Sequence, residues 1–309
     1  MNNRQHRTDW VRAEAERLGF SFVGFARAER LEQPARRLEA WLNQGAHGRM
    51  AWMENYFDLR IDPTKLVPGA KTVICFAFNY FNPDAQNDPD APRISRYAYG
   101  EDYHFVVKRH LKTLLQAMQA QFGDFTGRCF VDSAPVMERE WAERAGLGWN
   151  GRHTLTIHPQ QGSFFFLAEI ICDLDMVYDD PIRDHCGTCR RCIDACPTNA
   201  ISDSGYWLHA DRCISYLTIE LRDEIPVEFQ GKMENRMFGC DICQDVCPWN
   251  RFAKRHQKPA FAPHPDLLHL TRRDWEDITE EVFGRVFKKS AVKRIKYEGL
   301  KKNIRFLKK

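Results

Sequence analysis

The hydrophobic positions of the first 178 residues follow two periodicities that alternate along the chain. Short apolar runs predict strands at residues 21–27, 71–81, 128–132, 154–159 and 163–174, the last two as a hairpin around Gln160–Gly162. Helical spacing predicts helices at residues 8–19, 31–45, 105–123 and 136–148. Because strands and helices alternate, the fold class expected for residues 1–178 is α/β (α+β).

The most regular helical stripe lies in residues 105–123. Its apolar side chains recur every three or four residues, which indicates packing rather than a cofactor site; they are Val107, Leu111, Leu114, Leu115, Met118 and Phe122. No G-x-G-x-x-G opens a helix after a strand, and there is no P-loop. A nicotinamide cofactor in a Rossmann unit is therefore not expected.

The candidate redox chemistry is concentrated between Cys186 and Pro248. Residues 186–197 read C-x₂-C-x₂-C-x₃-C-P, the spacing with which bacterial ferredoxins hold iron–sulfur clusters. A second run at 240–248 also ends in Cys-Pro, but Met237 stands where a regular run has its first cysteine. We interpret Cys213 as the replacement, so the segment after it is expected to lie against the second cluster.

Eight cysteines form two sets of four. In two-cluster ferredoxins the cysteine beside the proline ligates the other cluster. We therefore predict one 4Fe-4S cluster on Cys186, Cys189, Cys192 and Cys247, and another on Cys196, Cys213, Cys240 and Cys243. A disulfide framework is typical of small secreted chains, and structural zinc of separated C-x₂-C pairs, so both fit poorly. The three remaining cysteines lie in strand-like runs and are expected in the core: Cys75, Cys129 and Cys172.

Composition and charge restrict the class of protein further. The 309 residues suffice for about two domains, with 43% hydrophobic and 28% charged residues as in globular proteins. No apolar stretch is long enough to span a membrane and no export signal is evident, so a cytoplasmic protein is expected. The net charge of +3 is uneven, because residues 285–309 hold eleven Lys and Arg against one acid, Glu298. Such a basic end predicts a polyanionic partner.

Several ordered motifs resemble the epoxyqueuosine reductase family. They are LRIDPTKLVPGAKTVI, ISRYAYGEDYH, VDSAPVMEREWAERAGLGWNGRHTLTIHPQQGSFFFLAEI, the double cysteine run and CISYLTIE, and the resemblance extends to about residue 305. It implies an oxidoreductase that reduces epoxyqueuosine to queuosine in the tRNA anticodon, the last step of that modification. It further implies a cobalamin bound by the α/β domain and supplied with electrons by two 4Fe-4S clusters, in a core related to reductive dehalogenases.

The resemblance also implies roles for individual residues. Asp132 takes the position of the family's proton donor, although on the sequence alone an Asp before Ser-Ala-Pro reads as a turn or helix cap. We expect a buried site beside the corrin to raise its pKa and keep it protonated. The implied cobalamin contacts are Arg60, Tyr97, Asn150, His153, Thr154, Ser215 and Tyr216. Arg60 also reads as a solvated loop arginine, and His153 is not expected to ligate cobalt.

Three domains are expected: a cobalamin-binding catalytic domain (1–178), a ferredoxin-like domain (179–258) and a helical basic segment (259–309). In the last, Phe287, Ala291 and Ile295 are predicted to face the body, and Gly299 to break the helix. The candidate tRNA contacts are Lys293, Arg294, Lys296, Lys301 and Lys302. The alternative for this segment is a frayed, solvated helix. Many family members continue into helical repeats where this chain stops.

Competing functions remain open on the sequence alone. Besides the tRNA-modifying reductase, they are a reductive dehalogenase acting on a small organohalide, a ferredoxin-type electron carrier, and a nucleic-acid-binding module with structural clusters. The lack of a twin-arginine signal and the basic end count against a dehalogenase, and the long N-terminal domain counts against a carrier. The reductase would need an external electron donor, and we expect a monomer.

Overall fold

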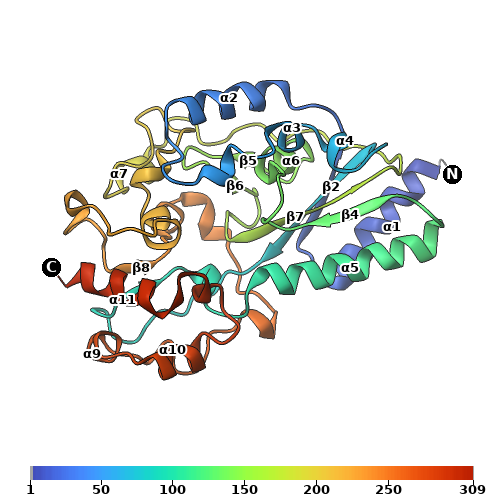
Figure 1. The fold of residues 1–309 in the computed structure, drawn as a ribbon. Helices are drawn as coiled ribbons and strands as arrows, with labels where there is room; N and C mark the ends of the chain where they lie inside the picture. Colours follow the sequence, from blue (N-terminus) through green and yellow to red (C-terminus); the bar gives the residue numbers. More distant parts are fainter. Residues whose placement is uncertain (1–2, 309) are drawn as a thin grey trace.

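A four-stranded antiparallel sheet forms the centre of the computed structural model, which describes residues 3–308 (Figure 1). The strand order is β1-β2-β7-β4, with bounds β1 (Phe22–Arg27), β2 (Thr72–Asn79), β7 (Phe165–Cys172) and β4 (Gly127–Phe130). Neighbouring strands are antiparallel throughout, and Glu169 of β7 lies opposite both Cys75 of β2 and Phe130 of β4. The mixed α/β content is confirmed, and the antiparallel pairing makes it α+β.

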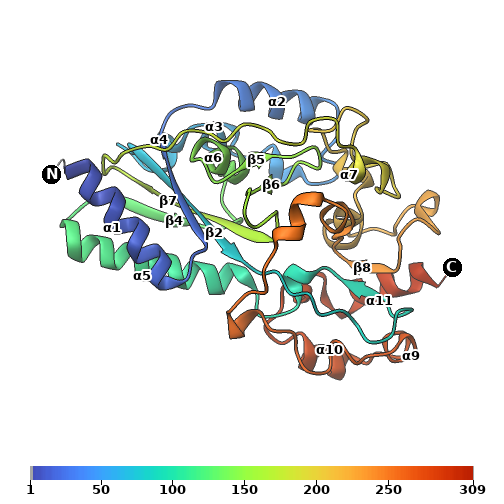
Figure 2. The same cartoon turned by 180° about the vertical axis from the view of Figure 1, so that it is seen from behind.

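Helices cover both faces of this sheet (Figures 1 and 2). One face carries α1 (Asn3–Leu18) and α5 (Tyr103–Phe122), and the other carries α6 (Glu138–Arg144), with α2 (Glu32–Asn43), α3 (Phe57–Ile61) and α4 (Pro63–Leu66) alongside. The stripe of α5 packs as predicted, since Val107, Leu111, Leu114 and Met118 are fully buried in the same core as Phe76 and Phe78. The opposite core contains Cys75, Ala77 and Trp141.

The predicted hairpin of residues 154–159 and 163–174 is wrong. Only an isolated bridge joins His158 to Gly162. The first segment instead forms β6 (Thr156–Ile157), which pairs with β5 (Trp149–Asn150). Thr156 and Ile157 are thereby used in the pairing with β5, while β7 pairs with β2 along its whole length and with β4 over Glu169–Cys172.

The cysteine-rich region consists of short elements and loops. They are α7 (Arg191–Asp194), the π-helical turn Tyr216–Glu220, β8 (Arg236–Phe238) and α8 (Ile242–Asp245), and β8 pairs in parallel with β3 (Arg93–Ile94). Short 3-10 helices also occur here and elsewhere in the chain, at Ala51–Met53, Arg96–Ala98, Ala210–Arg212, Val227–Phe229, Pro248–Phe252 and Pro259–Phe261. The β3–β8 pairing joins this region to a segment far upstream in the chain.

The basic C-terminal segment is packed rather than frayed. It contains α9 (Arg272–Glu276), α10 (Glu280–Val286), the 3-10 helix Ala291–Ile295 and α11 (Lys296–Leu307). Phe287, Ala291 and Ile295 are buried, as predicted. Helix α11 continues through Gly299, so the predicted break there is wrong; the chain turns instead at Lys296, whose φ is 59°. Lys309, part of the predicted tail, lies outside the described residues.

No helix within residues 3–308 has the length and apolarity that crossing a membrane requires.

Candidate active site and cluster region

Asp132 lies just beyond the end of β4, at the edge of the sheet. Its φ of 52° is in the left-handed region, which few residues other than glycine, Asn and Asp adopt. Its carboxylate accepts a hydrogen bond from the Tyr103 hydroxyl, and His104 Nε2 lies 3.0 Å from the same oxygen. The Asp132 amide in turn donates to Glu138 Oε1 at 2.6 Å. Four side chains from three segments therefore meet at one point.

The N-terminus of α5 positions two of these partners. Asp102 caps the helix by accepting from the His104 amide at 3.0 Å, and it also lies 2.7 Å from His104 Nδ1. The Tyr103 ring stacks on Phe166 of β7, with 4.2 Å between ring centroids. Capping and stacking fix the directions in which the imidazole and the phenol point, and both point at Asp132.

The pKa of Asp132 is lowered, the opposite of the direction expected for a buried site beside a corrin. The Asp132 side chain is 46% exposed, yet burial by the surrounding protein is the largest influence on its pKa, and burial acts to raise it. Hydrogen bonds from His104 and Tyr103 outweigh this effect and lower the pKa of Asp132 below its usual value. Asp132 is therefore ionised at neutral pH.

Two neighbours of Asp132 hold protons in its place. Burial alone would lower the pKa of His104, but the hydrogen bonds to Asp102 and Asp132 raise it to about 9. Burial raises the pKa of Glu138 to about 8, and the Asp132 charge adds to this effect. The site thus stores its protons beside the carboxylate rather than on it. Tyr103, His104 and Glu138 were not predicted from the sequence, although all three lie within the quoted motifs.

Tyr97 is brought to the same place. Its ring centroid lies 6.0 Å from that of Tyr103 and 6.1 Å from that of Phe238. Burial raises the pKa of Tyr97, with a further contribution from the Asp132 charge. Tyr97 therefore joins the Asp132 site to the cysteine-rich region.

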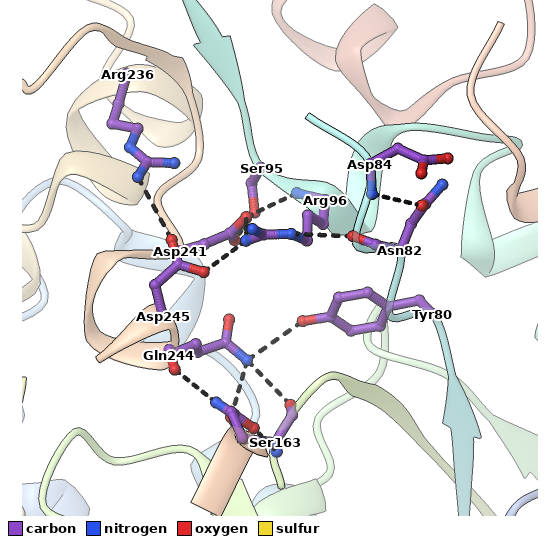
Figure 3. A network of polar contacts seen from close by, with 11 residues as sticks. Tyr80, Asn82, Asp84, Ser95, Arg96, Ser163, Arg236, Asp241, Gln244 and Asp245 are labelled. Carbon is purple, nitrogen blue, oxygen red and sulfur yellow. Dashed lines mark hydrogen bonds and ion pairs between the residues drawn. The ribbon is translucent and has the colours of Figure 1, made fainter. Parts of the chain in front are cut away.

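A polar network joins Ser95 and Arg96, the two residues before Tyr97, to the second cysteine run (Figure 3). Arg96 Nη1 lies 2.6 Å from Asp245 and 3.3 Å from Asp241, and the Ser95 hydroxyl also donates to Asp241. Gln244 Nε2 donates to the Ser163 carbonyl at 3.0 Å. Asp241 and Asp245 of this run are thus bonded to Ser95 and Arg96, and Gln244 is bonded to Ser163 before β7, as Figure 3 shows.

Three further predicted contacts form a second group, around Arg139. Asn150 Nδ2 donates to the Arg139 carbonyl at 3.2 Å, and the Arg139 guanidinium donates to the carbonyl of Thr154. His153 is 3% exposed, and burial lowers its pKa to about 4, so its ring is neutral. Its Nδ1 accepts from the Leu155 amide at 3.1 Å.

Two buried nitrogens of predicted cofactor contacts have no hydrogen-bond partner in the described part of the chain. They are His153 Nε2 and Arg60 Nε. Arg60 is only 8% exposed and has no carboxylate partner among residues 3–308, so the reading as a solvated loop arginine is wrong. Buried polar groups are normally satisfied. These two positions therefore fit a ligand rich in amide and phosphate oxygens, as the corrin side chains and tail of cobalamin are.

The eight candidate cluster cysteines, expected to form two groups, lie close to one another. Burial and then the neighbouring thiolates of Cys247, Cys186 and Cys189 together raise the pKa of Cys192 to about 11. Cys243 is affected in the same way, first by burial and then by Cys240 and Cys213, with Cys192 and Cys196 following. These mutual influences bring the eight thiols together in one region, and their division into two sets of four stays a prediction.

The donor chemistry of these groups fits cubane clusters. All eleven cysteines are free thiols, and no three metal-binding side chains in residues 3–308 converge closely enough to hold one metal ion. A cubane places its thiolates at separate corners of a larger body, so it does not need such convergence. Cys75 and Cys172 are fully buried in the sheet, whereas Cys129 is half-buried.

Ser215 and Tyr216 lie beside the second group. Burial raises the pKa of the Cys213 thiol, and hydrogen bonds from Ser215 and the Tyr216 amide act against this effect. The Tyr216 hydroxyl accepts from the Arg49 amide at 2.8 Å. Both residues therefore contact the candidate ligand or its immediate surroundings.

The five candidate tRNA contacts differ in their availability. Lys293 and Lys296 are exposed, and Arg294 is 45% exposed but paired with Glu220 at 2.8 Å. Lys301 donates to the Glu276 carbonyl at 2.8 Å, and Lys302 donates to the carbonyls of Leu221 and Asp223 at 2.8 and 2.7 Å. Lys301 and Lys302 are half-buried, and their hydrogen bonds hold α11 in place. The candidate tRNA contacts that remain exposed are therefore Lys293, Arg294 and Lys296.

Comparison with known proteins identifies the family. The family models "Epoxyqueuosine reductase QueG, DUF1730" and "4Fe-4S double cluster binding domain" match residues 60–133 and 185–250. The epoxyqueuosine reductase of Cellulophaga algicola is 54% identical over 308 residues, covering all of both chains. That of Escherichia coli is 41% identical over 288 residues, which cover 90% of this chain and 74% of its own.

Solved structures agree with this result. A crystal structure of an epoxyqueuosine reductase with an epoxyqueuosine-modified tRNA-Tyr stem loop matches with a TM-score of 0.86 at 29% identity, over 98% of this chain and 80% of that one. The catabolic reductive dehalogenase NpRdhA matches with a TM-score of 0.50 at 17% identity, over 98% and 38%, and shows likeness of fold alone. The resemblance seen in the sequence is confirmed, and the chain belongs to the epoxyqueuosine reductase family.

Proposed function

We propose that this chain reduces epoxyqueuosine to queuosine at the anticodon wobble position of tRNA, using cobalamin and two 4Fe-4S clusters. One observation carries the proposal: Asp132, held by Tyr103 and His104, lies next to Tyr97, which packs against the cysteine-rich region. A proton donor is thereby placed beside a route for electrons. Reduction of an epoxide to an alkene and water needs both.

The residues of the site have separate tasks in this reaction. When bound, cobalamin would supply a strongly reducing cobalt centre. Arg60, Asn150, His153 and Thr154 would hold its amide and phosphate groups. Asp132 delivers a proton to the epoxide oxygen as the carbon–oxygen bond breaks, and Tyr103 and His104 orient its carboxyl group.

The cysteines form the electron route in this proposal. Cys186, Cys189, Cys192 and Cys247 hold the outer cluster, and Cys196, Cys213, Cys240 and Cys243 hold the one nearer the active site. Ser215 and Tyr216, beside Cys213, lie between that cluster and the cofactor. A protein or small molecule outside the chain supplies the electrons. Because cluster thiolates need a reducing compartment, we place the enzyme in the cytoplasm. We also propose that it acts as a monomer.

The C-terminal segment provides the tRNA surface in this proposal. Lys293 and Lys296 present free ammonium groups, and phosphate contacts of this kind position a nucleic acid without reading its sequence. Burial raises the pKa of Asp132, and hydrogen bonds from His104 and Tyr103 lower it. The positive charge of Arg294 makes a smaller contribution in the same direction as these hydrogen bonds. We also propose the three domains expected from the sequence, with limits 1–178, 179–258 and 259–309.

The test uses anaerobically purified full-length protein with restored clusters and added cobalamin. We expect corrin absorption that stays with the protein, and conversion of an epoxyqueuosine-containing anticodon stem loop to the queuosine form. The same protein is given a bromophenol as a control substrate. Dehalogenation without conversion of the stem loop would favour the dehalogenase alternative, and failure to retain cobalamin would favour the electron carrier.

A further inference from the structure

Arg152 joins the segment that follows β5 to two loops of the cysteine-rich region. Its guanidinium donates to the Gly187 carbonyl at 2.7 Å and to the Ser204 carbonyl at 3.1 Å. Its own carbonyl accepts from the Tyr206 amide at 2.9 Å. Gly187 follows Cys186 directly in the first cysteine run. A cationic group is therefore held on the loop that is proposed to carry the outer cluster.

The charge of Arg152 has no counterion within residues 3–308. The side chain is half-buried, its Nε is buried without a hydrogen-bond partner, and no carboxylate of these residues pairs with it. The Asp184 carboxylate on the same loop is already engaged, because it accepts from the Cys186 amide and the Tyr206 hydroxyl, each at 2.5 Å. Burying a charge without a partner costs stability. A 4Fe-4S cluster with four thiolate ligands carries a net negative charge, so a cluster on this loop would supply the missing counterion.

Trp149 lies between residues that adjoin two of the proposed cluster ligands. Its ring centroid is 5.1 Å from that of His185, which precedes Cys186, and 4.9 Å from that of Trp249, which follows Cys247 by two positions. Trp149 is 0% exposed and forms a small buried cluster with Cys247, against which Cys186 packs. Its indole Nε1 has no hydrogen-bond partner in the described part of the chain. A buried N–H group is therefore left unsatisfied beside two proposed ligands.

Both residues also act on the Cys186 sulfur. Burial raises the pKa of the Cys186 thiol, whereas the Trp149 indole and the Arg152 amide, as hydrogen-bond donors, lower it. Because the indole N–H has no partner in ordinary hydrogen-bond geometry within residues 3–308, a thiolate or sulfide of a bound cluster would complete its bond. Hydrogen bonds to the sulfur atoms and the net charge nearby are among the factors that set the reduction potential of a cluster.

We propose that Arg152 and Trp149 raise the reduction potential of the outer cluster, an inference that rests on the proposed assignment of Cys186 and Cys247 to that cluster. Reduction adds one electron, taken from the donor outside the chain, and so adds one negative charge to the cluster. The Arg152 cation and the N–H groups at the Cys186 sulfur stabilise that added charge. The outer cluster thereby accepts electrons from a weaker reductant than it would without these two residues.

The test measures the potentials of both clusters in anaerobic full-length protein with restored clusters and without cobalamin. Electron paramagnetic resonance detects the reduced clusters as the applied potential is lowered. Arg152→Gln should weaken electron uptake by one cluster about tenfold, which is about 59 mV for one electron, and leave the other cluster unchanged. Trp149→Phe, which keeps a ring and removes the N–H, should weaken uptake by the same cluster about fivefold. Wild-type potentials in both variants would overturn the inference.

A conservative variant separates the charge of Arg152 from its structural role. Arg152→Lys keeps the positive charge but lacks the fork that reaches two carbonyl groups, so it should restore most of the potential lost in Arg152→Gln. A potential as low in Arg152→Lys as in Arg152→Gln would overturn the role of the charge. Iron content identifies any variant that loses a cluster. If Arg152→Gln does so, Arg152→Lys and Trp149→Phe are compared with the wild type instead, and a potential lowered only in Trp149→Phe supports the inference.

Two matched controls make the same chemical changes elsewhere in the molecule. Arg7 on α1 is half-buried, has an Nε without a partner among residues 3–308, and donates to the Asp175 carbonyl at 3.4 Å. Trp275 on α9 is 0% exposed, its Nε1 has no partner among the same residues, and its ring stacks on Phe287. Arg7→Gln and Trp275→Phe should leave both potentials unchanged. Shifts in these controls equal to those in the test variants would overturn the inference.

The outcomes distinguish this inference from the proposed function. A protein whose potentials shift as expected in the variants, but which leaves the stem loop unchanged, overturns the proposed function alone. Full iron content in Cys186→Ala would remove Cys186 from the clusters, and the inference would fail with that assignment. In Cys213→Ala protein, which should keep only the outer cluster, Arg152→Gln should cause the same shift. A shift that disappears there would place Arg152 beside the other cluster and overturn the inference.

Discussion

His104 Nε2 lies 3.0 Å from the Asp132 carboxylate, and this contact sets the charge of the site while the substrate is absent. The imidazole is positioned by Asp102, 2.7 Å from its other nitrogen. Together the two carboxylates overcome the effect of burial and raise the pKa of His104 to about 9. The pair is therefore a cation beside an anion at neutral pH, and proton transfer to substrate requires that arrangement to change.

Replacing Asp132 by Asn should abolish most of the activity and leave the structure intact. Asn tolerates the left-handed backbone that Asp132 adopts, so the loop should keep its conformation. The amide has no acidic proton, and turnover should fall by about 10² or more. Stem-loop conversion, iron content and corrin absorption are the measurements. Near-normal turnover with intact cofactors would remove Asp132 from the mechanism.

Replacing His104 by Gln should destabilise the protein in a pH-dependent way. The pKa of His104 is raised from 6.5 to about 9 in the folded protein, so its stabilisation is complete below pH 6.5 and is lost as the pH rises through 9. The variant should lose about 2 kcal/mol of unfolding free energy at pH 6. The difference should shrink toward zero by pH 10. Denaturant unfolding at several pH values measures it, and a difference independent of pH would contradict the ion pair.

The cysteine assignment predicts about eight iron atoms per chain in anaerobic protein. Cys213→Ala should lower the iron content by one cluster, because Cys213 belongs to the second group of thiols. Cys75→Ala is the matched control, since Cys75 is buried in the central sheet opposite Glu169. Iron and sulfide analysis, together with electron paramagnetic resonance, measures the number of clusters in each variant. Full iron content in Cys213→Ala and a loss in Cys75→Ala would reverse the assignment.

The Arg96 network should be worth more to stability than a surface ion pair. Arg96→Ala leaves the Asp241 carboxylate, whose side chain is 2% exposed, without its cation, and should cost about 3 kcal/mol. Arg255→Ala breaks a bond to the exposed Asp84 and should cost less than about 1 kcal/mol. Thermal unfolding of the cluster-loaded proteins measures the loss of stability in each of the two variants. Equal losses would show that the network in Figure 3 contributes no more than the surface pair.

The exposed lysines of the C-terminal segment should bind phosphate. Changing Lys293 and Lys296 together to Ala should weaken tRNA binding and reduce the salt slope by up to about two units. Lys71→Ala with Lys112→Ala removes the same charge from exposed positions elsewhere and should leave the slope unchanged. Affinities at several salt concentrations give the slopes. The same slope in both double variants and the wild type would exclude these two lysines from the tRNA surface.

The sequence by itself determined the features that depend on short spacings. The two cysteine runs, the apolar stripe of residues 105–123 and the family motifs are all readable from neighbours in the chain. The spacing of Cys186, Cys189 and Cys192 is by itself enough to indicate a cluster loop. Helical periodicity and ligand spacing are local properties, so they do not depend on how distant segments pack.

Only the tertiary structure decided features that depend on distant segments. Residues 154–159 do not form a hairpin with β7, because Thr156 and Ile157 pair with Trp149 and Asn150 of β5 instead. Helix α11 continues through Gly299 because its apolar face, with Leu300 and Ile304, packs on a core that outweighs the weak helix preference of one glycine.

The active site shows the same division. Asp132 was identified from its motif, but its charge was not, because His104 and Tyr103 come from the start of another helix. Glu169 reads in the sequence as one acid in an apolar strand, and only the tertiary structure reveals that it is fully buried. Electrostatic effects depend on which groups meet in space and on how much water remains between them, and the order of residues along the chain does not specify either.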